Sequence, residues 1–310
     1  MGTLRSALRG VFMLPCVLLL PVSGALAQPT LESLWPNADG LRWDYEITVT
    51  SHFGAAENFT APAMMQLAGT AETAGGTAQV LVAGHGLGPG VAAAPALDPL
   101  LRAVWRARPD LRAAIAARYA TPGLAEVPPP WYPVFLHPGY FMKGSTEIQM
   151  WLPEVNHPTW TYLEDNLTSG ATFTQQLIPE IADNVYLHGT VEAVDVTVTT
   201  QAGSYDHAVR MGYVVDYGLS QGTDPDGNPV GSSRSETRGH VHYVPEVGPV
   251  ELLEDFLPYV EVDCSPNPCP PEWSDHLGES AQTVSLSLVR EPVAVVARSW
   301  SEIKQLYRNR

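Results

Sequence analysis

Apolar and polar residues alternate with a period of two over long stretches of this 310-residue chain. The cleanest run is 41–50, where Leu, Trp, Tyr, Ile and Val at odd positions alternate with charged residues and threonines. Successive side chains of a strand point to opposite faces, so this run predicts a strand with one buried face. The same alternation over 64–72 and 77–83, around Gly75 and Gly76, predicts a β-hairpin.

A longer block of alternation predicts three antiparallel strands, at 191–200, 205–217 and 232–244. Turn-forming residues separate them, because glycine, serine, aspartate, asparagine and proline gather at 201–204 and 223–228. Further strands are expected at 145–152, 158–164, 170–178 and 283–289, whereas 250–257 has a mixed pattern. The sequence therefore predicts a mainly β fold, a large curved antiparallel sheet of half-barrel or sandwich-like form.

A helical insertion is predicted over 98–120, between the strands. Asp98 is a suitable N-cap and Pro99 suits the first helical position. Apolar residues follow at helical spacing, and Pro109 divides the segment into two short helices. We expect these helices to cover an open face of the sheet or to act as a lid over it.

The first 27 residues have the features of a secretory signal sequence. Arg5 and Arg9 precede an apolar run at 11–22, and Ala25-Leu-Ala27 forms a cleavage site. The apolar run is too short for a spanning helix, and no later stretch is long and apolar enough. The sequence thus predicts a soluble bacterial protein, secreted or periplasmic and not integral to the membrane, with one β-rich domain at 28–300 and a tail at 301–310.

Cleavage after residue 27 removes two arginines and no acids. It leaves 15 Lys and Arg against 33 Asp and Glu, a net charge of −18. Nucleic acids and anionic membrane surfaces need a cationic face, so this charge disfavours both as partners. Cys264 and Cys269 are the two remaining cysteines, and in an exported protein they favour a disulfide over a metal site.

Three segments resemble motifs shared by many uncharacterised bacterial secreted proteins. The stretch 34–45, LWPNADGLRWDY, is similar to their opening YxPLxxGxxWxY pattern, and 198–205, VTTQAGSY, is similar to an AG[ST][FY] hairpin. The stretch 243–250, YVPEVGPV, resembles YxPGVGxV, with Glu246 where those proteins usually have glycine. The resemblance covers roughly 34–257, allowing for a large insertion. It implies a β-sheet architecture and implies no catalytic residue.

Two candidate sites suggest chemistry, each with a simpler alternative. Gly218-Leu-Ser220-Gln-Gly222 matches the G-x-S-x-G hydrolase motif, and Asp255 or Asp263 and then His276 follow in hydrolase order. That motif needs a strand-to-helix turn, however, whereas here a loop and another strand follow Ser220.

The second candidate is a metal site. His240 and His242 lie two residues apart, so both imidazoles fall on one strand face, with Glu246 beyond them, and this arrangement suits a divalent metal. A third histidine is missing, and paired surface histidines are the alternative.

The leading hypothesis is an exported protein without a catalytic site. It would bind an apolar small molecule or lipid, or an envelope protein, and would need no cofactor. The alternatives are a serine hydrolase using Ser220 and His276, or a divalent-metal binder using His240 and His242.

Overall fold

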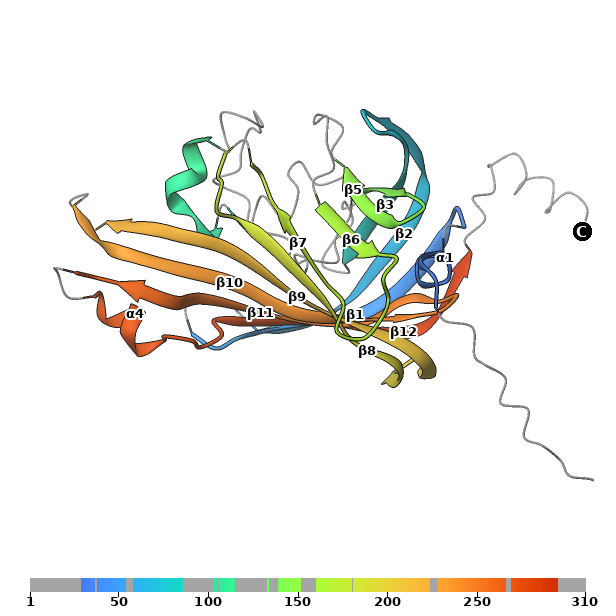
Figure 1. Ribbon diagram of the computed structural model, residues 1–310. Coiled ribbons are helices and arrows are strands. Elements are labelled where there is room, and N and C mark those ends of the chain that lie inside the picture. The colour runs from blue at the N-terminus through green and yellow to red at the C-terminus, as the bar shows by residue number, and fades with distance from the viewer. Residues whose placement is uncertain are drawn as a thin grey trace, which may run out of the picture.

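The computed structural model describes residues 29–36, 38–53, 58–85, 103–104, 106–114, 133, 139–151, 160–179, 181–223, 228–265 and 269–294 (Figure 1). The expected signal sequence and the expected tail lie outside these residues. Within them the fold is mainly β, as predicted, and its helical elements are short. The strands are β1 (Leu41–Ser51), β2 (Phe59–Thr73), β3 (Gly76–His85), β4 (Gly139–Lys143), β5 (Glu147–Trp151), β6 (Trp160–Glu164), β7 (Thr172–Gln176), β8 (Tyr186–Thr200), β9 (Gly203–Thr223), β10 (Pro229–Val244), β11 (Gly248–Asp263) and β12 (Gln282–Ala294). The helical elements are α1 (Leu31–Leu34), η1 (Pro109–Leu111) and α4 (Pro271–Asp275).

All twelve strands belong to one antiparallel sheet, in the order β6-β5-β4-β3-β2-β1-β12-β11-β10-β9-β8-β7. Strands that are consecutive in sequence pair with one another, except β6 and β7, and β1 also pairs with β12. The edges of the sheet are therefore β6 and β7, which follow one another along the chain. The backbone N–H of Thr161 in β6 donates to the side-chain oxygen of Gln175 in β7, so the sheet nearly closes on itself.

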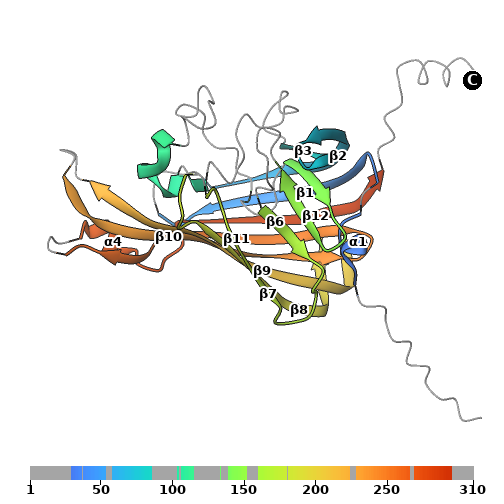
Figure 2. The ribbon, with the colours of Figure 1, turned by 45° about the horizontal axis from the view of Figure 1, so that its top comes forward.

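The sheet has one apolar and one polar face because its strands alternate as the sequence predicts. In β1 the residues Trp43, Tyr45, Ile47 and Val49 are all buried. The same holds for alternate residues of β12, at 284, 286 and 288. The long strands curve, and the helical segment around residue 110 lies on the concave side, as do β5 and β6 (Figures 1 and 2). The apolar residues thus face the concave side.

The predicted helical insertion is described only in part. Residues 103–104, 106–107 and 112–114 are helical, and η1 begins at Pro109, where the sequence predicts the break. The expected N-cap Asp98 and the second half of the insertion lie outside the described residues. Among the helices that the structure does describe, none has the length and apolar character needed to span a membrane.

Two features differ from the simple alternating pattern. The mixed stretch 250–257 lies inside the 16-residue strand β11, because Glu254 is buried on the apolar face and disguises the alternation. Between β8 and β9 the register shifts where Asp195 and His207 both adopt positive φ angles, 58° and 62°. His207 is consequently exposed, whereas its place in the predicted alternation groups it with buried residues.

Candidate functional site

Residues 103–114 are fixed to the concave face by Arg108, which is 5% exposed. Its guanidinium donates to the side-chain oxygen of Asn184 at 3.0 Å and to the carbonyl oxygen of Tyr217 in β9 at 2.8 Å. It also forms an ion pair with Asp110, with Nη2 and Oδ2 separated by 2.7 Å. A buried guanidinium requires such partners, because an unpaired buried charge is strongly disfavoured. Arg108 therefore ties the insertion to the sheet through polar bonds.

Ser220 belongs to the same network. Ser220 is buried, with 6% of the residue exposed, and its hydroxyl donates to Oδ1 of Asp110 at 3.0 Å. Burial alone would raise the pKa of Asp110, but hydrogen bonds and charge from Arg108, together with the bond from Ser220, lower it. Asp110 is thus an ionised acceptor that links the insertion to β9.

The structure gives no support to a hydrolase centre at Ser220. Ser220 lies within β9, paired with Ser233 of β10, and not at the start of a helix. His276 lies just after α4, where its ring stacks on Phe53 and its Nδ1 is 2.9 Å from a carboxylate oxygen of Glu279. Ser220 and His276 therefore have separate partners. The serine hydroxyl donates to Asp110, which is not one of the hydrolase residues considered from the sequence.

The candidate acids have structural partners as well. Oδ1 of Asp255 accepts hydrogen bonds from the hydroxyls of Ser280 and Thr283, and Asp263 accepts one from the N–H of Ser265. None of these contacts connects an acid to His276. The order of residues in the sequence imitates a hydrolase, but the described contacts do not assemble one.

Arg106, two residues before Arg108, contacts the concave face differently. Its guanidinium carbon lies 3.9 Å from the ring centroid of Phe256 in β11, and Nη1 donates to the side-chain oxygen of Gln282 in β12 at 3.2 Å. Residue Arg106 is exposed, so water reaches its guanidinium beside Phe256. Burial lowers the pKa of Arg106, while nearby Tyr217 and Glu254 act to raise it.

Hydrogen-bonded tyrosines cross the apolar face beside Arg106. The hydroxyl of Tyr213 donates to Glu254, which is 5% exposed, at 2.7 Å, and the hydroxyls of Tyr217 and Thr237 are 2.7 Å apart. Burial raises the pKa of both tyrosines, and the charge of Glu254 raises that of Tyr213 further. The phenols therefore stay neutral. The hydroxyl of Tyr243 is fully buried further along this face and has no hydrogen-bond partner in the part of the chain that the structure describes.

The predicted metal ligands lie on the other, convex face. His240 and His242 share one face of β10, as the sequence predicts, with ring centroids 5.4 Å apart. Nδ1 of His242 is 3.1 Å from Glu251 in β11, and Nδ1 of His240 is 3.3 Å from a guanidinium nitrogen of Arg210. Burial and the charges of Arg210 and His242 lower the pKa of His240.

Within the described part of the chain, no three His, Cys, Asp or Glu residues are grouped as metal ligands. Glu246, the third ligand considered from the sequence, is exposed in the turn between β10 and β11. The described surroundings of the two histidines are those of polar surface side chains, and metal binding stays an untested prediction.

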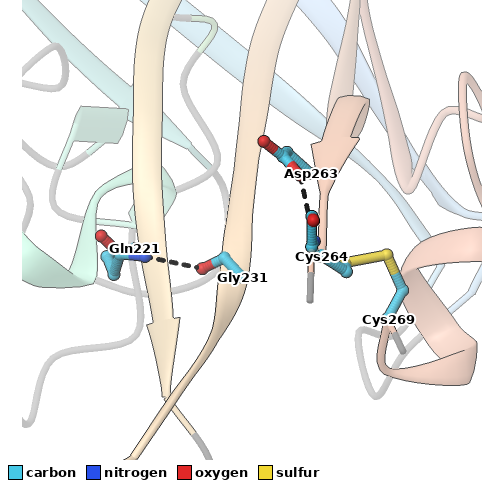
Figure 3. The surroundings of a disulfide bond; sticks show 6 residues. Gln221, Gly231, Asp263, Cys264 and Cys269 are labelled. Carbon is cyan, nitrogen blue, oxygen red and sulfur yellow. Dashed lines mark hydrogen bonds between the residues drawn. A yellow bond between two sulfur atoms is a disulfide. The ribbon is translucent and has the colours of Figure 1, made fainter. Parts of the chain in front are cut away.

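Cys264 and Cys269 are joined by a disulfide, with Cα atoms 5.0 Å apart, at the end of β11 (Figure 3). Nearby, the side-chain amide of Gln221 in β9 donates to the carbonyl oxygen of Gly231 in β10. Gly231 has a φ of +140°, and a Cβ atom there would lie 2.6 Å from the carbonyl oxygen of Asp263. The disulfide thus closes a loop against a tightly packed strand end, away from the concave face.

Sequence reasoning missed the polar residues of the concave face. Arg106 and Arg108 are ordinary charged positions in a helical pattern, and Glu254 is one acid among many. The available signal was the three charged residues, at 106, 108 and 110, among the apolar residues of 103–111, together with the break in alternation at Glu254. A charged residue at an otherwise apolar position of a strand or helix indicates a buried polar group that needs hydrogen-bond partners.

No protein-family model matches this chain, and no curated protein matches it. Among solved structures, it is similar to a candidate exported protein with a YmcC-like fold from Bacteroides fragilis, with 11% identity and a TM-score of 0.32. It is also similar to a candidate lipoprotein from Parabacteroides distasonis, with 10% identity and a TM-score of 0.27. Both matches cover 83% of this chain and 97% of the other chain. A LolA superfamily protein from Nitrosomonas europaea matches 83% of this chain and 86% of its own, with 10% identity and a TM-score of 0.21. Similarity at this level does not assign the chain to a family.

Proposed function

We propose that this chain is an exported binding protein that holds an apolar small molecule or lipid against the concave face of its sheet. The observation that carries the proposal is the contrast between this face and its described cover. The face is a continuous apolar surface formed by strands from the whole sheet. Of the described residues of the cover, 103–104 and 106–114, Ala103, Val104 and Ala107 are buried apolar residues and Leu111 is half-buried against the core, while polar bonds from Arg108 hold the segment in place.

Such a cover is separable from the surface beneath it. A hydrogen bond contributes about 1 kcal/mol net, and bonds to charged groups about 1.5–3 kcal/mol. An alkyl chain gains about 0.8 kcal/mol for each buried methylene, so about ten methylenes yield roughly 8 kcal/mol. A lipid chain of ordinary length is therefore able to offset the loss of the cover's small apolar contacts and of several of its polar bonds.

Export is supported by two features of the sequence. The first 27 residues have the pattern of a secretory signal, and three segments resemble motifs of bacterial secreted proteins. The location proposed for the protein is therefore the periplasm or the exterior of a bacterium. The disulfide between Cys264 and Cys269 suits either compartment, because both are oxidising.

The direct test is a titration of the purified protein with a fluorescent fatty acid. The expected result is saturable binding near one probe per chain, with displacement by unlabelled fatty acid. A second readout is amide hydrogen exchange. The N–H groups of Arg108 and Leu111 donate to carbonyl oxygens within the cover, so their exchange should speed up when a ligand lifts it.

Absence of saturable binding by any apolar probe would reject a small-molecule ligand and leave an envelope protein as the partner to seek. Saturable binding with unchanged exchange in 106–114 would place the ligand elsewhere and contradict the concave-face site. The variant Ser220→Ala, assayed with a short-chain ester beside the unmodified protein, tests the hydrolase alternative. Equal activity in both, or none in either, removes Ser220 as a nucleophile.

A further inference from the structure

Arg106 differs from the other arginines in what surrounds it. Six arginines, at 42, 108, 210, 234, 238 and 290, each place a guanidinium nitrogen 2.6–2.8 Å from a carboxylate oxygen. Arg106 has no ion pair of this kind with any residue that the structure describes. Its described contacts are the ring of Phe256 and the amide oxygen of Gln282.

Acids outnumber basic residues by 33 to 17 in this chain, so an arginine without a carboxylate contact is conspicuous. Glu254 is close enough to act on the pKa of Arg106, although burial acts more strongly and in the opposite direction. The carboxylate of Glu254 instead accepts the hydroxyl of Tyr213 at 2.7 Å. Because Arg106 is exposed, water solvates its guanidinium, and the N–H groups that Gln282 does not engage are open to an anion from solution.

We infer that Arg106 binds the anionic headgroup of an amphiphilic ligand, a carboxylate or a phosphate, while the ligand's apolar tail lies on the concave face. This inference rests on the proposed function and specifies the class of ligand. It adds a headgroup contact that an apolar surface alone does not require.

The geometry around Arg106 suits that task. Phe256 supports the flat face of the guanidinium, and Gln282 engages only Nη1. The remaining N–H groups, on Nε and Nη2, form the fork that matches the two oxygens of a carboxylate or phosphate. Gln282 is also the first residue of β12, whose buried row continues with Val284, Leu286 and Leu288. A headgroup held at Arg106 therefore lies at one end of a buried apolar row, which a tail can follow once the groups that cover the row move away.

The hydroxyl of Tyr243, which has no hydrogen-bond partner among the described residues, lies further along the same face, in β10. Tyr243 is fully buried, however, so it offers no surface to a ligand while the interior is packed as described. Arg106 retains solvent-accessible area and is the group that a headgroup reaches first.

The test measures competition by ligands that share a tail and differ in headgroup. Oleic acid, oleoyl lysophosphatidic acid and uncharged oleyl alcohol each displace a neutral fluorescent probe, N-phenylnaphthylamine, from the purified protein below their micelle concentrations. For the unmodified protein at neutral pH, one or both anionic ligands should bind roughly tenfold more tightly than the alcohol, as expected for charge-assisted bonds. The tighter of the two identifies the headgroup as carboxylate or phosphate.

Variants assign that preference to Arg106. In Arg106→Gln the anionic ligands should lose roughly tenfold in affinity while oleyl alcohol binds unchanged, and Arg106→Lys should recover part of the loss because it keeps the charge but not the fork. The matched control is Arg210→Gln on the convex face, where Arg210 pairs with Glu192, and it should leave all affinities unchanged. Thermal unfolding of each variant verifies that it is folded.

The outcomes separate this inference from the function on which it rests. If no ligand displaces the probe, or the probe itself does not bind, both proposals fail. If the alcohol binds as tightly as both anionic ligands, or Arg106→Gln and Arg106→Lys keep the full preference for an anion, the assignment to Arg106 fails and binding of an apolar ligand stands.

Discussion

Single residues in this fold adopt strained conformations where the sequence departs from a common pattern. Glu246 has a φ of 63°, and it follows Pro245 in the turn whose ends are joined by a bond from Val247 N–H to the carbonyl oxygen of Val244. A proline followed by a positive φ is the arrangement of a type II turn, which favours glycine at the second of these positions. The resembling proteins usually have glycine there. Glycine adopts this φ without strain, which agrees with the glycine that the sequence resemblance implies at this position.

Replacing Glu246 with glycine should stabilise the protein. A left-handed conformation costs an ordinary residue about 1–2 kcal/mol, and the greater freedom of glycine in the unfolded chain offsets about 0.4–1 kcal/mol of the gain. We expect the free energy of unfolding of Glu246→Gly to rise by about 0.5–1 kcal/mol in urea denaturation. Glu246→Ala keeps the strain and removes the same side chain, so it serves as the control and should change little. Equal stability of the two variants would show that φ is not the cause.

For single residues, the sequence predicted which face of a strand a side chain occupies better than which residues it contacts. It placed His240 and His242 on one face of a strand, and the structure has them there. Their nearest charged neighbours, Glu251 and Arg210, come from β11 and β9. Those neighbours depend on strand register, which bulges shift at several points. A period-two pattern reveals the face of a side chain but not the residue opposite it.

Among the elements, strands with one polar face were predictable and strands with a buried polar group were not. The pattern at 41–50 predicts β1 almost to its ends, because the apolar positions 43, 45, 47 and 49 are buried and Leu41 is half-buried. β11 lacked a clear pattern because Glu254 takes an apolar position and is satisfied by Tyr213, 41 residues away. The helical pair at 98–120 was expected from Pro109 and an apolar stripe, yet the arginines that fix it were not singled out.

Arg108 should control how firmly the insertion lies on the sheet. Arg108→Gln removes the ion pair with Asp110 and most of the bonds to Asn184 and Tyr217, and we expect amide exchange at 106–114 to rise at least tenfold. Breaking a buried pair costs about 3–5 kcal/mol at most, and local opening of the insertion should take up most of that loss. Amides in the centres of β9 and β10 should keep their protection.

Ser220→Ala provides a graded comparison, since it removes one hydrogen bond to Asp110 and leaves Arg108 in place. Its effect on exchange in 106–114 should be small, in line with about 1 kcal/mol for a single bond. If Arg108→Gln exchanged no faster than Ser220→Ala, apolar packing of Ala103, Val104 and Ala107 would have to be the main anchor instead.

For the whole molecule, a curved antiparallel sheet was predicted and its closure was not. The pairing of β1 with β12 joins residues more than 200 positions apart, and no local pattern specifies such a partner. Asp44 in β1 lies at the seam, the junction between β1 and β12, where it accepts hydrogen bonds from Arg42 at 2.6 Å and from Arg290 in β12 at 2.6 Å. The sheet therefore depends on a carboxylate at the junction of its two halves.

Acid should destabilise the whole sheet, and the seam at Asp44 should contribute measurably. Burial would raise the pKa of Asp44, but the bonds and charges of Arg290 and Arg42 lower it. The pKa of Glu236 is likewise lowered by Arg234 and Arg238 against the effect of burial, and that of Glu251 by its bond to His242. A carboxyl group whose folded pKa is depressed adds stability above its unfolded pKa, and this stability is lost as pH falls through the folded value.

The stability that these carboxylates contribute should therefore be lost progressively as pH falls below about 4.5. His240 adds a loss at higher pH, because its lowered pKa lets the unfolded chain take up a proton first, from about pH 6.5 downward. Urea unfolding at several pH values between 7 and 3 measures the profile.

Asp44→Asn should be about 1 kcal/mol less stable than the unmodified protein at pH 7, since solvent screens the largely exposed Arg290. The gap between the two curves should narrow as pH falls towards 3, because the unmodified carboxyl group progressively takes up a proton. A constant gap between them at every pH would mean that Asp44 acts through shape and hydrogen bonding alone, and not through the charge that joins β1 to β12.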